Sequence, residues 1–541
     1  NERNPGIAEN IQEGGKRRRI KRLAKKSLIN ENKKYWLDVG RSELEKALQL
    51  SKNEGLARNI ILVVGDGMSL STISAARVYK GQQEGRDGSS SMLSWEHFPH
   101  LGLSKTYNVN AMVPDSAATA FAMVSGVKTN YFTVGFDNTI IKGSPESQLN
   151  ATKVDTILHW AQEAKMKTGL VTTARVTHAT PAALYARTAH RDWECDRKMP
   201  ELRPAKVRDI TQQLVEDAPG KDIDVVLGGG RGSFTPAEYE EQLMLFSPSH
   251  QISFNQGISK FDCSRLDNKD LVEKWQKLNK NGGFVQTKSG LNNLNYTGVD
   301  KLLGLFSWSH MPYTDELTTG LDIPSLSEMT GAALDFLQNK STDGYFLMVE
   351  GGRIDHAHHE GSAVRSLSET LELDRTVDLI MEKINLKDTL VLVTADHSHT
   401  MTMGGYPGRE ADITGVVKGD DGWIMKGMDG HPFPILGYAN GPGFLNLRVK
   451  ENQTKGNWES IERSNNLAEG DSAHYAYNQP SGIPLKTETH GGDDVGIWGI
   501  GPLTHLLHST HEQTYIAHLM SLAGCIGPYK DTPRCTALHR T

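Results

Sequence analysis

The sequence lacks the features that would place the chain across a membrane or on nucleic acid. No apolar run approaches the roughly 18 residues that a membrane-spanning helix needs, and the mean hydropathy of -0.46 indicates a soluble protein. Neither sign of charge dominates, because 59 Lys and Arg residues face 65 Asp and Glu residues. The net charge of -6 gives no support for nucleic-acid binding. No internal repeat is visible, and 541 residues are enough for one large α/β domain with insertions.

Cysteine is also scarce, with four residues in the whole chain, which allow three pairings. Four N-glycosylation sequons fit a secreted glycoprotein, namely those at Asn150, Asn295, Asn339 and Asn452. No signal peptide is visible, so we expect the numbering to start at a mature N-terminus. No apolar tail follows Cys535, so a lipid-anchor signal is either absent or already removed, and membrane anchoring stays open.

One basic stretch, at residues 16–26 (KRRRIKRLAKK), breaks the even distribution of charge. We interpret it as part of a solvated, flexible arm. A proprotein cleavage site and a contact with an anionic surface remain alternatives. Leu37–Leu50 then shows the apolar spacing of an amphipathic helix, with a weak point at Gly40. Such a helix is most often packed on the surface of its own domain.

Several apolar runs read as buried strands, and each adjoins residues that can bind a metal or a phosphate. The runs are Asn59–Val64, Gly169–Thr173, Tyr345–Val349, Thr389–Thr394 and Val495–Ile500. The adjoining residues are Asp66; Arg175, His178 and Thr180; Glu350, Asp355, His356 and His359; Asp396 and His397; and His490. Open α/β sheets place their ligands at the carboxyl ends of strands. A single histidine in such a loop is usually just solvated, but five such segments together indicate one shared site.

A serine opens a helix that we predict beside this site. Asp115 and Ser116 suit a helix start. Small residues continue to Met123, and Gly126 follows where the helix would end. A hydroxyl at a helix N-terminus faces unpaired N–H groups and the positive end of the dipole, a place that can hold a phosphate. Alone this pattern is usually an ordinary cap, so its weight comes from the metal-binding residue types elsewhere in the chain.

The ligand types favour zinc and magnesium. Asp355 and His359 stand four residues apart, so on a helix both would face the same ion. A carboxylate with an imidazole suits Zn²⁺. The carboxylates and hydroxyl of Asp66, Glu350 and Thr180 suit Mg²⁺ instead.

Taken together, these segments resemble animal alkaline phosphatases. The matching motifs are GDGM at Gly65, VPDSAATA at Val113, TTARVTHATPA at Thr172, EGGRIDHAHHE at Glu350, TADHSH at Thr394, GYPGR at Gly405 and ETHGGDD at Glu488. They keep the family's order over most of the chain, from about Trp36 to Pro528, which makes the set far more specific than any one motif. The resemblance implies hydrolysis of small phosphate monoesters to an alcohol and inorganic phosphate through a phosphoserine.

The resemblance also implies a role for each site residue. Ser116 would be the nucleophile, and Asp115, Ser116 and Arg175 would bind phosphate, Arg175 through its planar guanidinium. The implied ligands are Asp355, His359 and His490 for one Zn²⁺; Asp66, Asp396 and His397 for a second Zn²⁺ that also contacts Ser116; and Asp66, Thr180 and Glu350 for one Mg²⁺. His178 and His356 would lie beside the hydrated Mg²⁺.

The implied fold is α/β, with a large, mostly parallel central sheet flanked by helices. We expect four parts: a basic arm at residues 1–34, the core with its N-terminal helical arm at 35–403, a loop-rich, crown-like insertion at 404–485, and the remainder of the core with a C-terminal disulfide segment at 486–541. The resemblance further implies a homodimer in which the N-terminal helix embraces the partner. It also implies an extracellular or cell-surface location.

The family's disulfides transfer unevenly to this chain. Cys525 and Cys535 match its C-terminal bridge. Cys195 and Cys263 would be left to pair, but the family's other bridge does not align cleanly with them.

A calcium site of the vertebrate relatives is also incomplete here. Phe306 matches the residue that offers a backbone carbonyl, and Asp322 matches the aspartate. Ser307 falls where the first glutamate would be, and nothing in Thr235–Glu238 clearly matches the second. Two missing carboxylates remove most of the charge that holds a hard cation. We therefore expect this Ca²⁺ site to be weak or empty.

Two other functions remain as alternatives. A related two-metal phosphodiesterase or sulfatase would use similar ligands. Sulfatases need a Cys or Ser in a C/S-x-P-x-R setting, which the sequence after Ser116 lacks, and phosphodiesterase relatives usually carry threonine as the nucleophile. A catalytically weak surface receptor or matrix protein could keep the same fold, but a complete set of serine, arginine and metal ligands argues against it.

Overall fold

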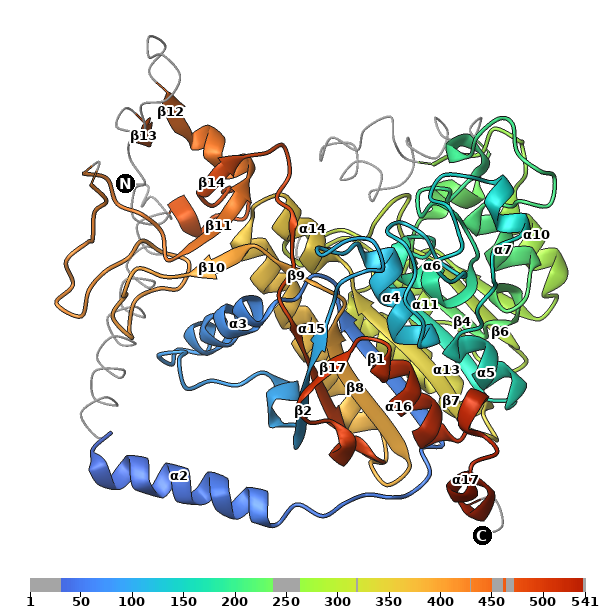
Figure 1. The fold of residues 1–541 in the computed structure, drawn as a ribbon, viewed down its shortest axis with the longest axis horizontal. Helices are drawn as coiled ribbons and strands as arrows, with labels where there is room; N and C mark the ends of the chain where they lie inside the picture. The colour runs from blue at the N-terminus through green and yellow to red at the C-terminus, as the bar shows by residue number, and fades with distance from the viewer. Residues whose placement is uncertain are drawn as a thin grey trace, which may run out of the picture.

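Ten strands form one sheet at the centre of the protein, with helices on both faces (Figure 1). The computed structural model describes residues 31–236, 263–317, 320–428, 430–449, 461–463 and 471–538. The predicted architecture, a large and mostly parallel α/β sheet, is confirmed.

The strands lie in the order β17-β2-β16-β8-β1-β7-β3-β4-β6-β5. Their bounds are β1 (Asn59–Gly65), β2 (His100–Lys105), β3 (Lys167–Arg175), β4 (Val225–Gly229), β5 (Gly282–Val285), β6 (Lys301–Leu305), β7 (Tyr345–Gly351), β8 (Thr389–Ala395), β16 (Val495–Ile500) and β17 (Thr510–Glu512). Among these described strands only β16 runs antiparallel to its neighbours, β8 and β2. The other pairs are parallel. Each apolar run that the sequence indicates lies in one of these strands.

Side chains that alternate along the strands fill two cores, one on each face of the sheet. On β1, Ile61 and Val63 belong to one core and Ile60 and Leu62 to the other, and all four are fully buried. The first core also takes side chains from α3 (Leu70–Gln83), α13 (Leu326–Lys340) and α15 (Ala363–Lys383). The second takes them from α4 (Ser116–Ser125), α5 (Ile157–Glu163), α6 (Ala179–Tyr185) and α16 (Tyr515–Gly524). Burial on both faces explains why these strands are continuous apolar runs.

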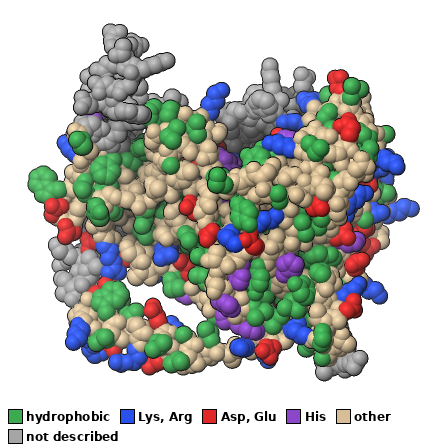
Figure 2. Space-filling model, in the orientation of Figure 1, with side chains coloured by type: hydrophobic (Ala, Val, Ile, Leu, Met, Phe, Trp, Pro, Cys, Tyr) green, Lys and Arg blue, Asp and Glu red, His purple; other side chains and the backbone are tan. Residues whose placement is uncertain are grey.

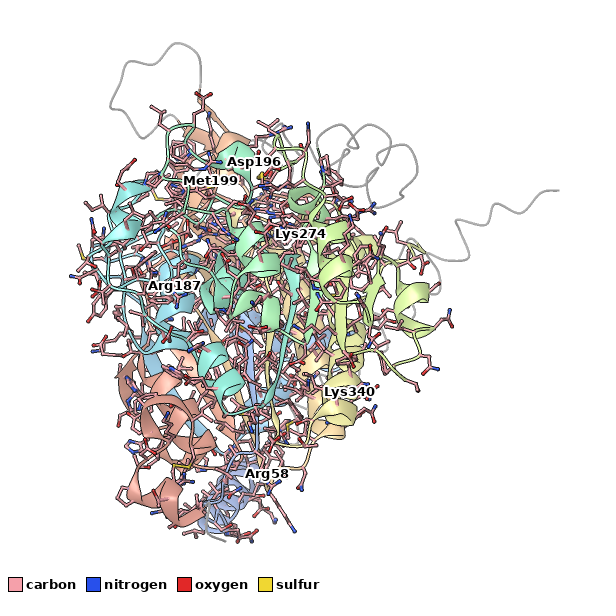
Figure 3. All side chains as sticks on the ribbon, turned by 90° about the vertical axis from the view of Figure 1, so that its right-hand side faces the viewer. Arg58, Arg187, Asp196, Met199, Lys274 and Lys340 are labelled. Carbon is pink, nitrogen blue, oxygen red and sulfur yellow. A yellow bond between two sulfur atoms is a disulfide. The ribbon has the colours of Figure 1, made fainter. Side chains whose placement is uncertain are left out.

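The carboxyl ends of the parallel strands meet at one edge of the sheet. In Figure 3, Arg58, just before β1, and Lys340, at the end of α13, lie toward the lower end of the molecule. Asp196 and Met199 lie toward the upper end, to which β1 and β7 run. Besides the N-terminal helix, the other described α-helices are α7 (Ile210–Glu216), α10 (Leu271–Leu278), α11 (Lys288–Asn292), α12 (Thr314–Leu317), α14 (Arg353–His359) and α17 (Pro533–Leu538).

Short strands form three small sheets outside the central one. Their bounds are β9 (Ser398–His399) with β15 (His490–Gly491); β10 (Met401–Met403), β11 (Leu436–Gly441) and β14 (Ser481–Pro484); and β12 (Leu447–Val449) with β13 (Ile461–Arg463). Apart from β10, which ends just before residue 404, the strands of the last two sheets belong to the segment predicted as a crown-like insertion, which lies at one corner of the molecule (Figure 1). Its boundaries at 404 and 485 stay a prediction.

The N-terminal helix does not pack on its own domain as expected. Helix α2 (Lys33–Leu48) starts earlier than predicted because the Asn32 side chain accepts a hydrogen bond from the Tyr35 N–H at 3.1 Å. The helix continues through Gly40. None of its residues is buried, and Leu44 and Leu48 are 62% and 78% exposed. Figure 2 shows its hydrophobic side chains on the molecular surface, among charged ones.

Both disulfides are formed, so all four cysteines are paired. Cys525 and Cys535 form the bridge that the resemblance implies, with Cα atoms 5.4 Å apart. Cys195 and Cys263, which align poorly with the family, also bond to each other, with Cα atoms 6.0 Å apart. The pairing of Cys195 and Cys263, which the sequence left open, is therefore a second disulfide between residues 68 positions apart.

Removing each bridge should destabilise the protein by an amount that depends on the loop it closes. For the separation of 10 between Cys525 and Cys535, the chain-entropy model gives a loss of about 2–3 kcal/mol from the free energy of unfolding. For the longer loop between Cys195 and Cys263 it gives about 4 kcal/mol. Double alanine variants compared by denaturant unfolding measure both losses. Peptide mapping without reduction should recover both linked pairs, and free thiols in both would contradict a secreted protein.

The described helices include none that is long and apolar enough to cross a membrane. Of the four sequon asparagines, Asn150, Asn295 and Asn339 are exposed. Asn452 and the basic stretch at 16–26 lie outside the described residues.

Candidate active site

Ser116 is the first residue of α4, as predicted. The Asp115 side chain caps this helix by accepting a hydrogen bond from the Ala117 N–H at 3.2 Å. Gly126 ends it in the left-handed conformation, with φ of 77°. Ser116 is buried, and its Oγ lies 3.1 Å from Nε2 of His397. The hydroxyl thus lies at a helix N-terminus, in contact with a predicted metal ligand.

The ends of β1 and β8 bring three predicted ligands beside this serine. Nε2 of His397 lies 3.2 Å from Asp396 and 3.6 Å from Asp66, and all three side chains are fully buried. The Gly67 N–H and Thr119 Oγ1 donate to the Asp396 carboxylate at 3.0 and 3.2 Å. These donors fix the orientation of the carboxylate.

A second group of ligands comes from α14 and from the segment before β16. Oδ1 of Asp355 lies 3.4 Å from Nε2 of His359 and 3.3 Å from Nε2 of His490. The predicted spacing of Asp355 and His359 on one helix face is confirmed, since both lie in α14. One ligand atom from each of Asp66, Asp355 and His397 lies within 4.8 Å of the others, so the two groups adjoin.

Hydrogen bonds donated to backbone carbonyls set the tautomer of these histidines. Nδ1 of His359 lies 2.5 Å from the Glu488 carbonyl, Nδ1 of His490 lies 2.8 Å from the Pro114 carbonyl, and Nδ1 of His397 lies 3.3 Å from the Ser398 carbonyl. A carbonyl accepts only, so each Nδ1 carries the proton and each Nε2 keeps its lone pair. Metal-binding histidines are usually held in this way.

His399 is an important neighbour that we did not predict. It lies between two carboxylates, with Nε2 2.7 Å from Asp355 and Nδ1 2.5 Å from Glu488. Against the effect of burial, Glu488 and Asp355 raise the pKa of His399 to about 10. Because both ring nitrogens face carboxylate oxygens, His399 is placed to orient Asp355 through a hydrogen bond. Gly67 leaves room for this ring, since a Cβ there would lie 2.4 Å from it at a φ of +66°.

Four buried oxygen atoms of the predicted magnesium ligands have no hydrogen-bond partner among the described residues. These atoms are both carboxylate oxygens of Asp66, Oγ1 of Thr180 and Oε1 of Glu350. The hydroxyls of Thr172 and Thr180 lie beside Glu350 and lower its pKa, but burial outweighs them and raises it to about 7. A buried polar atom without a partner costs free energy. A hard cation would satisfy all four.

Carboxylates repel one another in this site. Burial is the largest cause that raises the pKa of Asp66, followed by the charges of Asp396, Asp355 and Glu350. Burial also raises the pKa of Asp396. Divalent cations would offset both effects, since they favour the charged carboxylates. The donor set of carboxylates, imidazoles and a hydroxyl therefore fits zinc and magnesium.

Arg175 lies at the end of β3 and is held by partners that we did not predict. Its Nε and Nη2 donate to the two carboxylate oxygens of Glu194, both at 2.8 Å. Its Nη1 lies 2.6 Å from Nε2 of His310, in the loop after β6. His310 follows an apolar strand, as the predicted ligands do, and this position was the signal that could have revealed it.

A second arginine, Arg191, joins Asp115 to the predicted magnesium neighbours. Its Nη1 donates to Oδ2 of Asp115 at 3.3 Å, and its Nη2 donates to Nε2 of His178 at 3.1 Å. Oδ1 of Asp115 accepts from the Phe132 N–H at 2.8 Å and from Asn108 at 3.2 Å. These donors occupy the Asp115 carboxylate. A contact between Asp115 and phosphate therefore stays a prediction that this geometry does not favour.

His178, His310 and His356 form one cluster, with one nitrogen from each within 4.8 Å of the others. Each ring also contacts a guanidinium: His178 that of Arg191, His310 that of Arg175, and His356 that of Arg353 at 3.1 Å. Three neighbouring cations make a direct metal site at this cluster unfavourable. The placing of His178 and His356 beside a hydrated Mg²⁺ stays a prediction.

Asp322, which matches an aspartate of the family's calcium site, accepts hydrogen bonds within this chain. Oδ1 of Asp322 accepts from the Ser289 N–H and Oγ at 2.8 and 2.9 Å, and the Asp322 side chain is exposed. Ser307 is buried next to Phe306. Glu238 lies outside the described residues.

This site defines an α/β enzyme with a serine at a helix start beside carboxylate and imidazole metal ligands. A family model described as alkaline phosphatase matches residues 57–526. The tissue-nonspecific alkaline phosphatase of Gallus gallus is 42% identical over 94% of this chain and 93% of its own length. The alkaline phosphatase of Gadus morhua is 40% identical over 91% and 97%, respectively. The chain therefore belongs to the alkaline phosphatase family.

Solved structures agree with the fold. The alkaline phosphatase of Thermus thermophilus has a TM-score of 0.58 and 24% identity, and the match covers 87% of this chain and 92% of that one. The enzyme of the Antarctic bacterium TAB5 has a TM-score of 0.55 and 20% identity over 88% and 99%. At these identities the likeness concerns the fold alone.

Proposed function

We propose that this phosphatase hydrolyses phosphate monoesters through a phosphoserine on Ser116, at a site with two Zn²⁺ ions and one Mg²⁺ ion. The observation that carries the proposal is the contact of Ser116 Oγ with His397 at the start of α4, amid Asp66 and Asp396. Membership of the family supports monoester hydrolysis and divalent metals.

The reaction consists of two displacements at phosphorus. Ser116 Oγ forms a bond to phosphorus while the ester oxygen leaves with a proton as the alcohol. Water then attacks the phosphoserine, the bond to Oγ breaks, and inorganic phosphate and the serine hydroxyl are restored. Serine is a weak nucleophile at its ordinary pKa and needs activation.

Protein groups would bind and orient the phosphoryl group. Arg175 would donate hydrogen bonds to two of its oxygens, where charge accumulates in the transition state. The first N–H groups of α4 and the positive end of its dipole lie at the same end of the helix. The Arg175 donors and this helix N-terminus both favour binding of a negatively charged phosphoryl group.

The metal ligands divide as the resemblance implies. Asp355, His359 and His490 would hold one Zn²⁺, and Asp66, Asp396 and His397 would hold the second beside Ser116. Asp66, Thr180 and Glu350 would hold Mg²⁺. When bound, the metals supply Lewis-acid activation of the nucleophile and of the leaving oxygen. His399 would keep Asp355 charged and oriented, which is the task of a group behind a ligand.

His178 should weaken Mg²⁺ binding relative to a carboxylate at the same place. We expect His178→Asp to bind Mg²⁺ about tenfold more tightly and to turn over more slowly, because a negative charge attracts the hydrated cation. Titration of activity with Mg²⁺ measures the change. His178→Asn, which adds no charge, is the control and should not tighten binding. An unchanged Mg²⁺ dependence of His178→Asp would contradict this proposal.

Substrate class separates the proposed activity from its alternatives. Turnover of p-nitrophenyl phosphate that EDTA abolishes is expected for a monoesterase. Preference for bis-p-nitrophenyl phosphate would indicate a phosphodiesterase. No turnover of either ester by metal-loaded protein would indicate a receptor or matrix protein.

Exposed apolar side chains support a homodimer. Leu44 and Leu48 on α2 are not buried by the described residues, and Tyr406 and Trp423 in the crown-like insertion are 93% and 77% exposed. A second copy could cover such groups. Two formed disulfides and exposed sequon asparagines support an extracellular or cell-surface location. We also retain the expectation of a weak or empty Ca²⁺ site.

A further inference from the structure

The guanidinium of Arg175 is clamped on one edge by Glu194. The two N–H···O contacts, both 2.8 Å, form a side-on bidentate pair through Nε and Nη2. The Glu194 side chain is only 9% exposed, and Thr177 Oγ1 donates to the same carboxylate at 2.6 Å. Such a pair fixes both the position and the plane of a guanidinium.

The clamp decides which edge of Arg175 can meet a phosphate. A guanidinium has N–H donors at Nε, Nη1 and Nη2. Glu194 uses Nε and one hydrogen of Nη2. The other edge, formed by Nη1 and the second hydrogen of Nη2, faces away from Glu194. On that edge His310 contacts Nη1 at 2.6 Å, and Ser309 Oγ contacts it at 3.3 Å.

His310 cannot satisfy both of the donors that it faces. Its Nε2 faces Nη1 of Arg175, and its Nδ1 faces the backbone N–H of Arg175 at 3.2 Å. An imidazole can accept a hydrogen bond at no more than one nitrogen. One of the two contacts is therefore weak, and Nη1 can exchange the imidazole for a phosphate oxygen.

Glu194 and His310 are each tied to other parts of the fold. Glu194 directly precedes Cys195 of the disulfide, and its carbonyl accepts from Thr211 Oγ1 at 2.6 Å. Figure 3 shows Asp196, two residues further on, at the upper end of the molecule. The His310 loop is tied across the strand ends, where the Met311 N–H donates to the Thr173 carbonyl at 2.9 Å.

We propose that Glu194 and His310 are positioning residues for Arg175, with opposite effects on phosphate affinity. Glu194 holds the guanidinium in the orientation that binds phosphate. His310 occupies Nη1 when no phosphate is present and competes with it. The inference rests on the proposed function, in which Arg175 binds the phosphoryl group.

The inhibition constant of inorganic phosphate measures this effect directly. Glu194→Ala should raise that constant about tenfold, because a mobile guanidinium loses a bidentate contact. Glu194→Asp should restore part of the affinity. His310→Ala should lower the constant about threefold, because it removes the competitor of phosphate. Glu216→Gln is the matched control, since Glu216 pairs with Arg208 at 2.7 Å on α7 and should leave the constant unchanged.

A double-mutant cycle with Arg175→Ala separates a positioning role from a structural one. In the Arg175→Ala background, Glu194→Ala should have no further effect on phosphate inhibition. A persistent effect, or none in the enzyme that keeps Arg175, would overturn the role of Glu194. A higher inhibition constant of phosphate in His310→Ala would overturn the proposed competition between His310 and phosphate for Nη1 of Arg175. If Arg175→Ala itself leaves the constant unchanged, the proposed function of Arg175 fails, which is a distinct outcome.

Discussion

Replacing Ser116 by alanine is expected to lower kcat for p-nitrophenyl phosphate by at least about 1000-fold, since covalent catalysis depends on the nucleophile. Metal content should stay the same, because the ligands are the carboxylates and imidazoles around it. Steady-state kinetics and elemental analysis of the same preparation measure both quantities.

Ser125→Ala is the matched control for this variant. Ser125 is the last residue of α4, and its hydroxyl donates to the Phe121 carbonyl at 2.6 Å. The control tests whether loss of any buried serine hydroxyl in this helix reduces turnover, and kcat should change little. Turnover of Ser116→Ala within tenfold of the parent enzyme would show that another group is the nucleophile.

Removing the metals is expected to abolish turnover and to lower the melting temperature, and the loss of stability should grow as the pH rises from 5 to 7. The cause lies in the buried carboxylates. Without metal, the pKa of Glu350 is raised to about 7, mainly by burial, whereas an unfolded glutamate titrates near 4.3. Between these values the metal-free native state holds a proton that the unfolded state has released.

The sign of the pH effect follows from this difference in bound protons. Where the native state binds more protons, the free energy of unfolding falls as the pH rises, by about 1.4 kcal/mol per pH unit for one group. The raised pKa values of Asp66 and Asp396 act in the same direction. Metal binding keeps these groups charged and removes the effect. Calorimetry at pH 5, 6 and 7, with and without chelator, should therefore show that the difference in melting temperature between metal-loaded and metal-free protein grows with pH. A difference that stays constant would contradict the assignment of these carboxylates as metal ligands.

Features that depend on short stretches of sequence could be predicted. Apolar runs located the parallel strands, and the residues after them, such as Asp66 and Asp396, meet at one edge because parallel strands all end there. The spacing of Asp355 and His359 placed both on one face of α14. The small residues between Asp115 and Gly126 gave the bounds of α4.

Features that depend on contacts between distant loops could not be predicted. Glu194 and His310 hold Arg175 from 19 and 135 residues away. His399 lies within a recognised motif, but its charge depends on Glu488, which is 89 residues further on. The pairing of Cys195 with Cys263 likewise follows from the approach of two loops. Periodicity and spacing carry no information on such contacts.

The exposed surface of α2 shows a different limit. Its apolar spacing predicts a face that needs covering, and the helix forms as predicted. The pattern does not specify which surface covers that face, and none of the residues that the structure describes buries it.

The most direct test of the account is to trap the covalent intermediate. Metal-loaded enzyme should be mixed with a phosphate monoester, quenched in acid and digested, and the phosphorylated peptide should be sequenced by mass spectrometry. We predict phosphate on Ser116, and no label in Ser116→Ala. Phosphate on any other residue, or full turnover without a labelled peptide, would contradict the proposed mechanism.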